Sequence, residues 1–313
     1  MPRRKILERL ILLAGFATLA ALLVRFRSSH VWTDVSQVGT GFLVIIPLQI
    51  CDHVLNALGW RFAFSAVDSD IPLWRLIRAR IAGDAINYLT PSASIAGELI
   101  RPRMLGEGKP EAVKNASVLV AKVAQTFGLA LFVLFGLLFV LRGQLDFFLH
   151  KDGQRALGVG ATVGLIAVLG IALTALTAQR RDGAYYWRLE GWAGALQGDV
   201  RRYLREHPIR FLVSALFFML GYAWGAIEVL VICRFLGIPM AAVMALAVEV
   251  LSIIIDGLLF IVPAKIGTQE AGKTVIFSGL GLAASQGLAF GLVRHVRELA
   301  WASLGFALFT FER

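Results

Sequence analysis

The feature that most constrains this chain is a series of long apolar runs separated by clumps of charge. The clearest run, Ala156–Ala178, has 23 residues without a charged side chain and carries a Gly160-x-x-x-Gly164 packing motif. A helix needs about 20 mostly apolar residues to cross the hydrocarbon core of a bilayer. The sequence therefore predicts six transmembrane helices: Leu10–Val24, Val38–Trp60, Ala116–Leu141, Ala156–Ala178, Phe211–Cys233 and Leu288–Phe311.

The composition excludes a soluble nucleic-acid-binding protein, even though the net charge is +10. Hydrophobic residues make up 58% of the chain and charged residues 17%, which leaves too little polar surface to cover a soluble core. The basic residues stand between apolar runs, as in a polytopic membrane protein, and do not form one stripe. Cys51 and Cys233 lie inside apolar segments and the five histidines lack metal-ligand spacing, so we expect no disulfide, metal site or cofactor.

Two further segments, 71–113 and 240–287, are apolar, but each is broken by a proline near its middle. We interpret both as re-entrant helical hairpins, because the first carries three arginines within residues 75–80 and such a limb does not cross lipid completely. Broken backbone is tolerated at membrane depth only where protein or a watery cavity surrounds it. The hydroxyl residues after the breaks are expected to cap the restarted helices: Ser92, Ser94 and Thr268.

The hairpins belong to an internal repeat. Asp84, Pro91, Glu98 and Arg101 stand at spacings of seven, seven and three, and Asp256, Pro263, Glu270 and Lys273 repeat those spacings 172 residues later. The same offset places the second span on the fifth and the third on the last. The sequence thus predicts two membrane repeats, 1–142 and 143–313, each with three spans and one proline-broken hairpin.

Three crossings are an odd number and a re-entrant hairpin changes no side, so the second repeat must enter the membrane from the opposite face. The predicted fold class is therefore an all-α polytopic membrane protein with an inverted-topology repeat. Twenty of the 31 Lys and Arg residues then lie on the side of the N-terminus: four before the first span, eight in 61–114, seven in 180–210, and Arg313. This asymmetry predicts that both termini are cytoplasmic and that 179–210 is a cytoplasmic loop on the membrane interface.

Ionisable side chains inside a membrane cost about 2.5–3.5 kcal/mol each on insertion scales, so they usually face a cavity and mark function. In the second span Gln49, Asp52, His53 and Asn56 form one polar stripe at helical spacing, although interhelical hydrogen bonding alone would also account for Gln49 and His53. The other candidates come from the later spans and both hairpins: Asp84, Pro91, Glu98, Arg101, Lys122, Glu228, Asp256, Pro263, Glu270, Lys273 and Arg294.

This pattern favours a transport site. Substrate sites of inverted-repeat transporters lie near the midplane, on interrupted helices whose free amides attract anions. Arg and Lys suit a phosphate, and buried carboxylates can carry protons because burial raises their pKa. We therefore expect an amphipathic anionic or zwitterionic substrate, with proton coupling left open. The alternative is a pair of kinked, buried hairpins that bind no ligand.

The stretches Asn87-Tyr-Leu-Thr-Pro91-Ser-Ala-Ser-Ile-Ala-Gly97-Glu98 and Val262-Pro263-Ala-Lys-Ile-Gly267-Thr-Gln-Glu270 resemble two motifs of the flippase-like family named for the transmembrane domain of bacterial lysylphosphatidylglycerol synthase. The pattern Arg294…Trp301…Gly305 is similar to the last helix of that family. The resemblance implies a multi-pass protein of the bacterial cytoplasmic (inner) membrane that moves lipids between leaflets. By position it implies core roles for Pro91, Gly97, Glu98, Arg101, Pro263, Gly267, Glu270 and Arg294.

Other features of the family bear on partners and chemistry. Its stand-alone members include proteins encoded with hopanoid or glycan-lipid pathways, so lipid-biosynthesis enzymes or a second copy of the chain are partners to test beside membrane lipids. The soluble aminoacyl-transferring domain of the two-part synthases is missing here, and lipid aminoacylation is not expected.

The leading hypothesis is a lipid translocase without enzymatic activity. One alternative is an intramembrane enzyme that modifies a lipid head group, with paired carboxylates as general acid and base. The sequence shows no nucleophile–base set or nucleotide loop for it. Another is an accessory subunit of a lipid-biosynthesis complex, which would tolerate neutral substitutions in the hairpins.

Overall fold

The computed structural model describes residues 17–25, 28–90, 96–143, 198, 200–258 and 262–311. Within these ranges every regular element is a helix, in agreement with the predicted all-α class. Several predictions lie wholly or partly outside the described residues: the spans Leu10–Val24 and Ala156–Ala178, the loop 179–210, and the first hairpin break with Pro91, Ser92 and Ser94.

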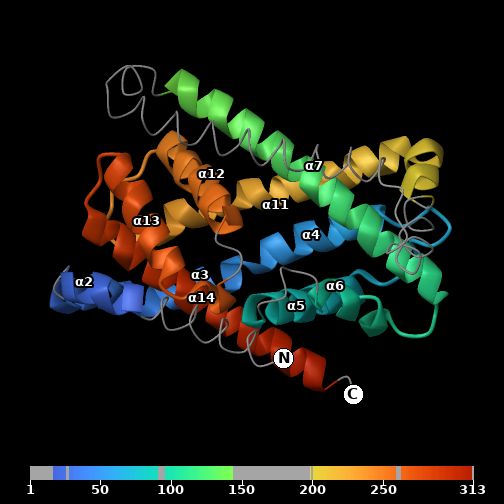
Figure 1. The fold of residues 1–313 in the computed structure, drawn as a ribbon, viewed down its shortest axis with the longest axis horizontal. Helices are drawn as coiled ribbons and strands as arrows, with labels where there is room; N and C mark the ends of the chain where they lie inside the picture. Colours follow the sequence, from blue (N-terminus) through green and yellow to red (C-terminus); the bar gives the residue numbers. More distant parts are fainter. Residues whose placement is uncertain are drawn as a thin grey trace, which may run out of the picture.

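The described residues of the first half form a long broken helix, a hairpin region and a second long helix. The broken helix consists of α2 (Ser28–Val38), η1 (Gly39–Gly41), α3 (Phe42–Leu48) and α4 (Ile50–Phe62). The hairpin region that follows consists of α5 (Leu73–Leu89), the short α6 (Ala96–Ile100) and η2 (Arg103–Leu105), and the half ends with α7 (Glu111–Gly143). Figure 1 shows α5 and α6 side by side beneath the long diagonal of α7.

The second half repeats this order from a long helix onward. It consists of α11 (Pro208–Phe235), α12 (Ala242–Leu258), η3 (Pro263–Lys265), α13 (Thr268–Gly279) and α14 (Ala284–Thr310). In Figure 1, α12 and α13 lie together and α14 runs from them past α5 towards the C-terminus. The helix α14 thus joins the second hairpin region to the first.

Three helical stretches of the described chain are long and apolar enough to cross a membrane: Val31–Phe62, Glu111–Val140 and Pro208–Phe235. They correspond to three of the predicted spans. The first begins at Val31 and not at Val38, because backbone hydrogen bonds continue a helix beyond its apolar stretch. The last predicted span is present as the continuous helix α14, whose interior carries Arg294, His295, Arg297 and Glu298.

Helices α4 and α11 pack antiparallel through the middle of the molecule (Figure 1). Near the start of this pair, Trp224 Nε1 donates a hydrogen bond to the carbonyl oxygen of Leu48 at 3.1 Å. Near its other end, Ser214 Oγ donates to the carbonyl oxygen of Gly59 at 2.7 Å. From the first contact to the second, the residue numbers increase along α4 and decrease along α11. The repeat-related helices α4 and α11 therefore run in opposite directions.

Two separate apolar cores stabilise the bundle. The first apolar core joins α4, α5, α7 and the start of α11, and includes Trp60, Leu76 and Phe218. The second apolar core joins α2, the end of α11, α12, α13 and α14, and includes Ile232 and Phe290. Between these cores, α4 and α11 carry the charged residues Asp52 and Glu228, which belong to the candidate site.

Candidate functional site

A cavity of about 520 Å³ opens between α4, α5, α7, α11, α12 and α14, and we call it the central cavity. Its volume lies within the roughly 300–1,000 Å³ of small-molecule sites. Polar residues from both halves of the chain line it. The charged ones are Asp52, Asp84, Lys122, Glu228, Glu249, Asp256, Lys265, Arg294, Arg297 and Glu298.

The central cavity lies between the two apolar cores along the helix axes. On α11, Phe218 belongs to the first apolar core and Ile232 to the second, whereas Gly221, Gly225 and Glu228 between them line the cavity. On the path from α2 to α4, Ile45 and Trp60 belong to opposite cores, and Asp52 lies between them. The charged groups therefore sit inside the apolar bundle, away from its ends.

In the first half, Arg101 connects the two limbs of the hairpin region. Its NH2 donates to Asp84 Oδ1 at 2.6 Å, and its NH1 donates to Glu98. Arg80 Nε also donates to Asp84, at 3.1 Å, and Lys122 Nζ donates to Glu98 at 3.1 Å. Four predicted residues thus form one network, together with Arg80, one of the three arginines on the first limb of the hairpin.

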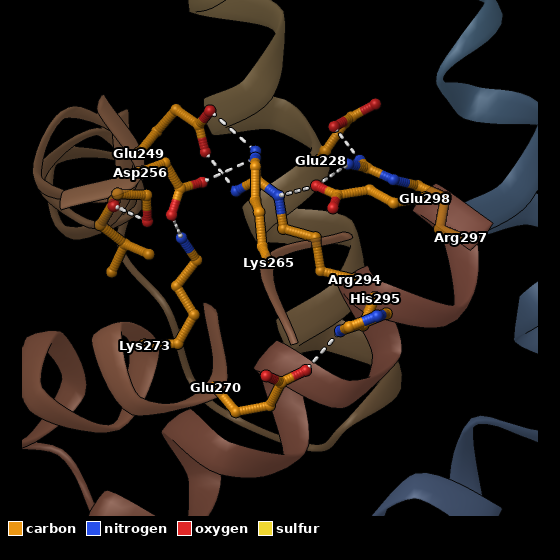
Figure 2. Close-up of polar contacts among 12 residues, drawn as sticks. Glu228, Glu249, Asp256, Lys265, Glu270, Lys273, Arg294, His295, Arg297 and Glu298 are labelled. Carbon is orange, nitrogen blue, oxygen red and sulfur yellow. Dashed lines mark hydrogen bonds and ion pairs between the residues drawn. The ribbon is translucent and has the colours of Figure 1, made fainter. Parts of the chain in front are cut away.

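The second half contains the matching ion pair. Lys273 Nζ contacts Asp256 Oδ1 at 3.3 Å, and these two residues are the repeat equivalents of Arg101 and Asp84. Lys265 Nζ donates to the other oxygen of Asp256 at 3.2 Å (Figure 2). Each half therefore ties its first limb to its restarted helix by a salt bridge across 17 residues.

Helix α14 supplies two arginines that bind carboxylates on other helices. Arg294 forms a bidentate pair with Glu249 of α12, with distances of 2.6 and 3.0 Å. Arg297 NH1 donates to Glu228 of α11. Glu298 lies within 3.7 Å of Arg297 and 3.8 Å of Arg294, and Figure 2 shows this group gathered along one side of α14.

Glycines on α11 make room for the polar groups of α4 and α12. A Cβ on Gly221 would lie 3.2 Å from Asp52 Oδ1, and one on Gly225 would lie 2.4 Å from Glu249 Oε1. Asp52 accepts a hydrogen bond of 2.7 Å from Asn56 Nδ2, and Asn56 in turn accepts one from Arg80. The predicted stripe on the second span therefore faces the cavity through Asp52 and the buried network through Asn56.

Lack of space explains the glycine of the first hairpin motif, and backbone conformation explains that of the second. Gly97 lies against α5, where a Cβ would come within 2.1 Å of the Gly83 carbonyl oxygen, and its N–H donates to Asn87 Oδ1 at 2.7 Å. Gly267 has a φ of 74°, in the left-handed region that favours glycine. A side chain at position 97 would clash with α5, and one at position 267 would strain the backbone.

The start of α13 corrects one prediction. Gly267 precedes the helix, and its N–H donates to Glu270 Oε2 at 2.9 Å. Thr268 does not cap the helix; its hydroxyl donates to the carbonyl oxygen of Lys265 at 3.0 Å. The prediction was wrong because the left-handed glycine shifts the helix start, and Glu270 reaches back over it. The other oxygen of Glu270 contacts His295 Nδ1 at 2.6 Å, so fully buried Glu270 faces α14 and does not line the central cavity.

Sequence reasoning missed Lys265, Tyr88 and Glu298 as residues of the central cavity. Lys265 stands inside the second hairpin motif, and Glu298 follows Arg294 at i+4, so motif position and helical spacing were the available signals. Of the predicted residues, Pro91 lies outside the described part of the chain. Among described residues, no group of three or more His, Cys, Asp or Glu is placed to hold a metal ion.

Comparisons with known proteins give one family. The model of the family described as "Lysylphosphatidylglycerol synthase TM region" matches residues 9–304. A "UPF0104 membrane protein" of Methanothermobacter thermautotrophicus is 26% identical over 204 residues, which cover 64% of this chain and 57% of the relative. The chain thus matches little more than half the length of that relative. No solved structure matches the chain.

Proposed function

Because the chain belongs to the family of the lysylphosphatidylglycerol synthase transmembrane region, we propose that it moves a lipid with an anionic or zwitterionic head group between membrane leaflets. The head group would pass through the central cavity while the acyl chains stay in the bilayer. The proposed location is the bacterial cytoplasmic membrane, with both termini in the cytoplasm. Membrane lipids are the proposed partners, and lipid-biosynthesis enzymes or a second copy of the chain are further ones to test.

The observation that carries this proposal is the charged cavity between two apolar cores. Ten charged residues line about 520 Å³ between the two apolar cores. Ionisable groups at such depth are costly and are kept where they line a substrate or ion path. Apolar side chains such as Leu134, Phe139 and Leu216 are exposed on the outer faces of α7 and α11, where acyl chains would lie.

Two features support the proposed inverted repeat. The repeat-related helices α4 and α11 are antiparallel, as two halves inserted from opposite faces require. The repeat-related ion pairs Asp84–Arg101 and Asp256–Lys273 occupy the same positions in their hairpin regions. An alternating exposure of one shared site is the mechanism that such symmetry allows.

Topology is tested by single cysteines at Val67 and Pro239, which are exposed and stand at repeat-equivalent positions. In a background that lacks Cys51 and Cys233, a membrane-impermeant maleimide should label Val67→Cys from the cytoplasm and Pro239→Cys from the outside. Labelling of both from one side would refute the inverted arrangement.

Transport is tested with the purified full chain in proteoliposomes that contain fluorescent lipids, read by a quencher that reaches one leaflet. The wild-type protein should speed exchange of at least one charged lipid over empty liposomes. Glu98→Gln and Asp256→Asn should each reduce the rate, since both residues belong to the hairpin networks. Lys109→Gln, which removes a surface partner of Asp70, is the matched control and should transport normally.

The same experiment separates transport from chemistry. Mass spectrometry of the lipids recovered from the liposomes should show unchanged molecules after exchange. If the protein consumed a lipid or produced a new one, and exchange stayed at the background rate, the enzymatic alternative would replace the proposed function.

A further inference from the structure

The cations that line the central cavity or lie next to it fall into two groups that differ in exposure. Arg294, Arg297 and the lysine behind Asp256, Lys273, have side chains that are 10%, 3% and 0% exposed. Lys122 and Lys265 are 44% and 31% exposed, and both line the cavity. The cations of the first group form buried ion pairs with carboxylates of the protein. The lysines of the second group expose their ammonium groups to the cavity.

Neither exposed lysine is needed to neutralise its carboxylate. Lys122 pairs with Glu98, which already binds the buried Arg101; Asp84, the other carboxylate that Arg101 contacts, is also paired with Arg80. Lys265 pairs with Asp256, which already binds the fully buried Lys273 at 3.3 Å. A buried carboxylate is costly unless it is paired, so Arg101 and Lys273 explain the stability of these sites. Each exposed lysine is therefore a second cation beside a carboxylate that already has one.

The number of hydrogen-bond donors left for a ligand also singles out Lys122 and Lys265. An ammonium group has three donors. Within the described residues, Lys122 donates to Glu98 at 3.1 Å and Lys265 donates to Asp256 at 3.2 Å, so both have donors for a ligand. The guanidinium of Arg294 already directs two of its nitrogens at Glu249.

The backbone at Lys265 is strained. Ala264 and Lys265 have φ values of 51° and 52°, in the left-handed region that side chains other than glycine rarely occupy. Strain of this kind persists where the surrounding structure imposes it, and it concentrates at ligand sites. Here it turns the chain after the second break so that Lys265 forms part of the cavity surface.

We propose that Lys122 and Lys265, one from each half of the chain, hold the phosphate of a phosphate-ester head group in the central cavity. This inference rests on the proposed function for its place in transport, but it assigns a ligand chemistry that can be measured by binding alone. Lysine is a suitable partner because it binds phosphate as a flexible point charge, which can release the group at either leaflet.

The acidic residues of the cavity are compatible with an anion. Asp84, Glu228, Glu249 and Asp256 each pair with a buried cation, and Glu298 lies within 3.8 Å of Arg294 and 3.7 Å of Arg297. Asp52, the sixth acidic residue of the cavity, accepts a hydrogen bond from Asn56. The two exposed lysines are then the cations left to attract a ligand in that space. A neutral sugar head group would offer no negative charge to either lysine.

Binding is measured by native mass spectrometry of the full chain in detergent. The probes are phosphatidylglycerol, a monoglucosyl diacylglycerol with the same acyl chains, and glycerol 3-phosphate. The variants are Lys122→Gln, Lys265→Gln and their double variant, with Lys122→Arg/Lys265→Arg to restore the charges. Lys109→Gln removes a lysine outside the cavity, where its hydrogen bond holds the pKa of Asp70 below the ordinary value.

We expect the wild-type chain to prefer phosphatidylglycerol over the glycolipid. Each glutamine variant should lose about tenfold in affinity for it, as expected for one charge-assisted contact. The double arginine variant and Lys109→Gln should bind as the wild type. Lysine-dependent binding of glycerol 3-phosphate but not of the lipid would assign the same phosphate site to a soluble ester. Equal binding of both lipids by the wild type, or unchanged binding in the double glutamine variant, would overturn the inference.

The liposome assay separates this result from the proposed function. Lysine-dependent binding in a protein that exchanges no lipid would refute transport and leave the phosphate site standing. Exchange of phosphatidylglycerol at the wild-type rate in the folded double glutamine variant would refute the site and leave transport standing.

Discussion

The bidentate pair between Arg294 and Glu249 offers the sharpest test of how the charged network is held. It joins α14 to α12 with distances of 2.6 and 3.0 Å, and the two side chains are only 10% and 4% exposed. Replacement of one partner by an apolar residue of similar size leaves the other charge buried without its counter-ion. The variants are Arg294→Met, Glu249→Leu and the double variant.

The expected magnitude follows from this geometry. Two hydrogen bonds to charged groups contribute about 1.5–3 kcal/mol each, and the loss of one partner of a buried pair typically costs about 3–5 kcal/mol. We therefore expect each single variant to lower the free energy of unfolding by about 3–5 kcal/mol. The double variant removes both buried charges, so it should lose about 2 kcal/mol or less. The coupling between the two sites should then exceed about 3 kcal/mol.

The assay is reversible unfolding of the purified chain in mixed micelles with a denaturing detergent, followed by circular dichroism. All three variants and the wild type are compared at one protein and detergent concentration. If the double variant lost the sum of the two single losses, with coupling below about 0.5 kcal/mol, the pair would not be the interaction that the structure shows. The surface pair Lys109–Asp70, in which Asp70 is 73% exposed, is the control, and its cycle should show a coupling of about 1 kcal/mol or less.

Three further predictions concern backbone and packing. Gly97→Ala places a Cβ 2.1 Å from the Gly83 carbonyl oxygen, so it should cost about 3 kcal/mol or more in the same unfolding assay, and a stable variant would refute the close approach. Gly225→Ala should displace Glu249 and lower stability by about 1–3 kcal/mol, whereas Gly257→Ala, with open space around its Cβ, should be neutral or stabilising. Ala264→Gly relieves a left-handed φ of 51° and should raise stability by about 0.5–1 kcal/mol; a loss would show that the side chain matters more than the strain.

Much of the architecture was predictable because a bilayer makes one simple demand on a spanning helix. Apolar length alone located the helices that cover Val38–Trp60, Ala116–Leu141 and Phe211–Cys233. The last helix was also predicted, although its interior carries four ionisable residues. The division into repeats 1–142 and 143–313 and the re-entrant nature of the hairpins stay predictions.

The sequence predicted many residues of the candidate site, but it did not predict which of them pair with each other. Equal spacing in both hairpins selected Asp84, Arg101, Asp256 and Lys273, and the structure shows that they pair as Asp84–Arg101 and Asp256–Lys273. Glu270 belongs to the same repeated motif, yet it is buried against His295 and does not line the cavity. Spacing along the chain indicates a shared helix face, but it does not tell which neighbouring helix that face meets.

The sequence by itself determined that this chain is a helical membrane protein with a duplicated charged motif, because hydropathy and spacing are properties of each segment alone. The tertiary structure decided which cations are committed to carboxylates and which are exposed to the central cavity. That decision depends on contacts between helices far apart in the chain, such as Arg294 with Glu249 and Lys122 with Glu98. It also depends on the left-handed turn at Ala264 and Lys265, which no local propensity favours and only the surrounding packing holds in place.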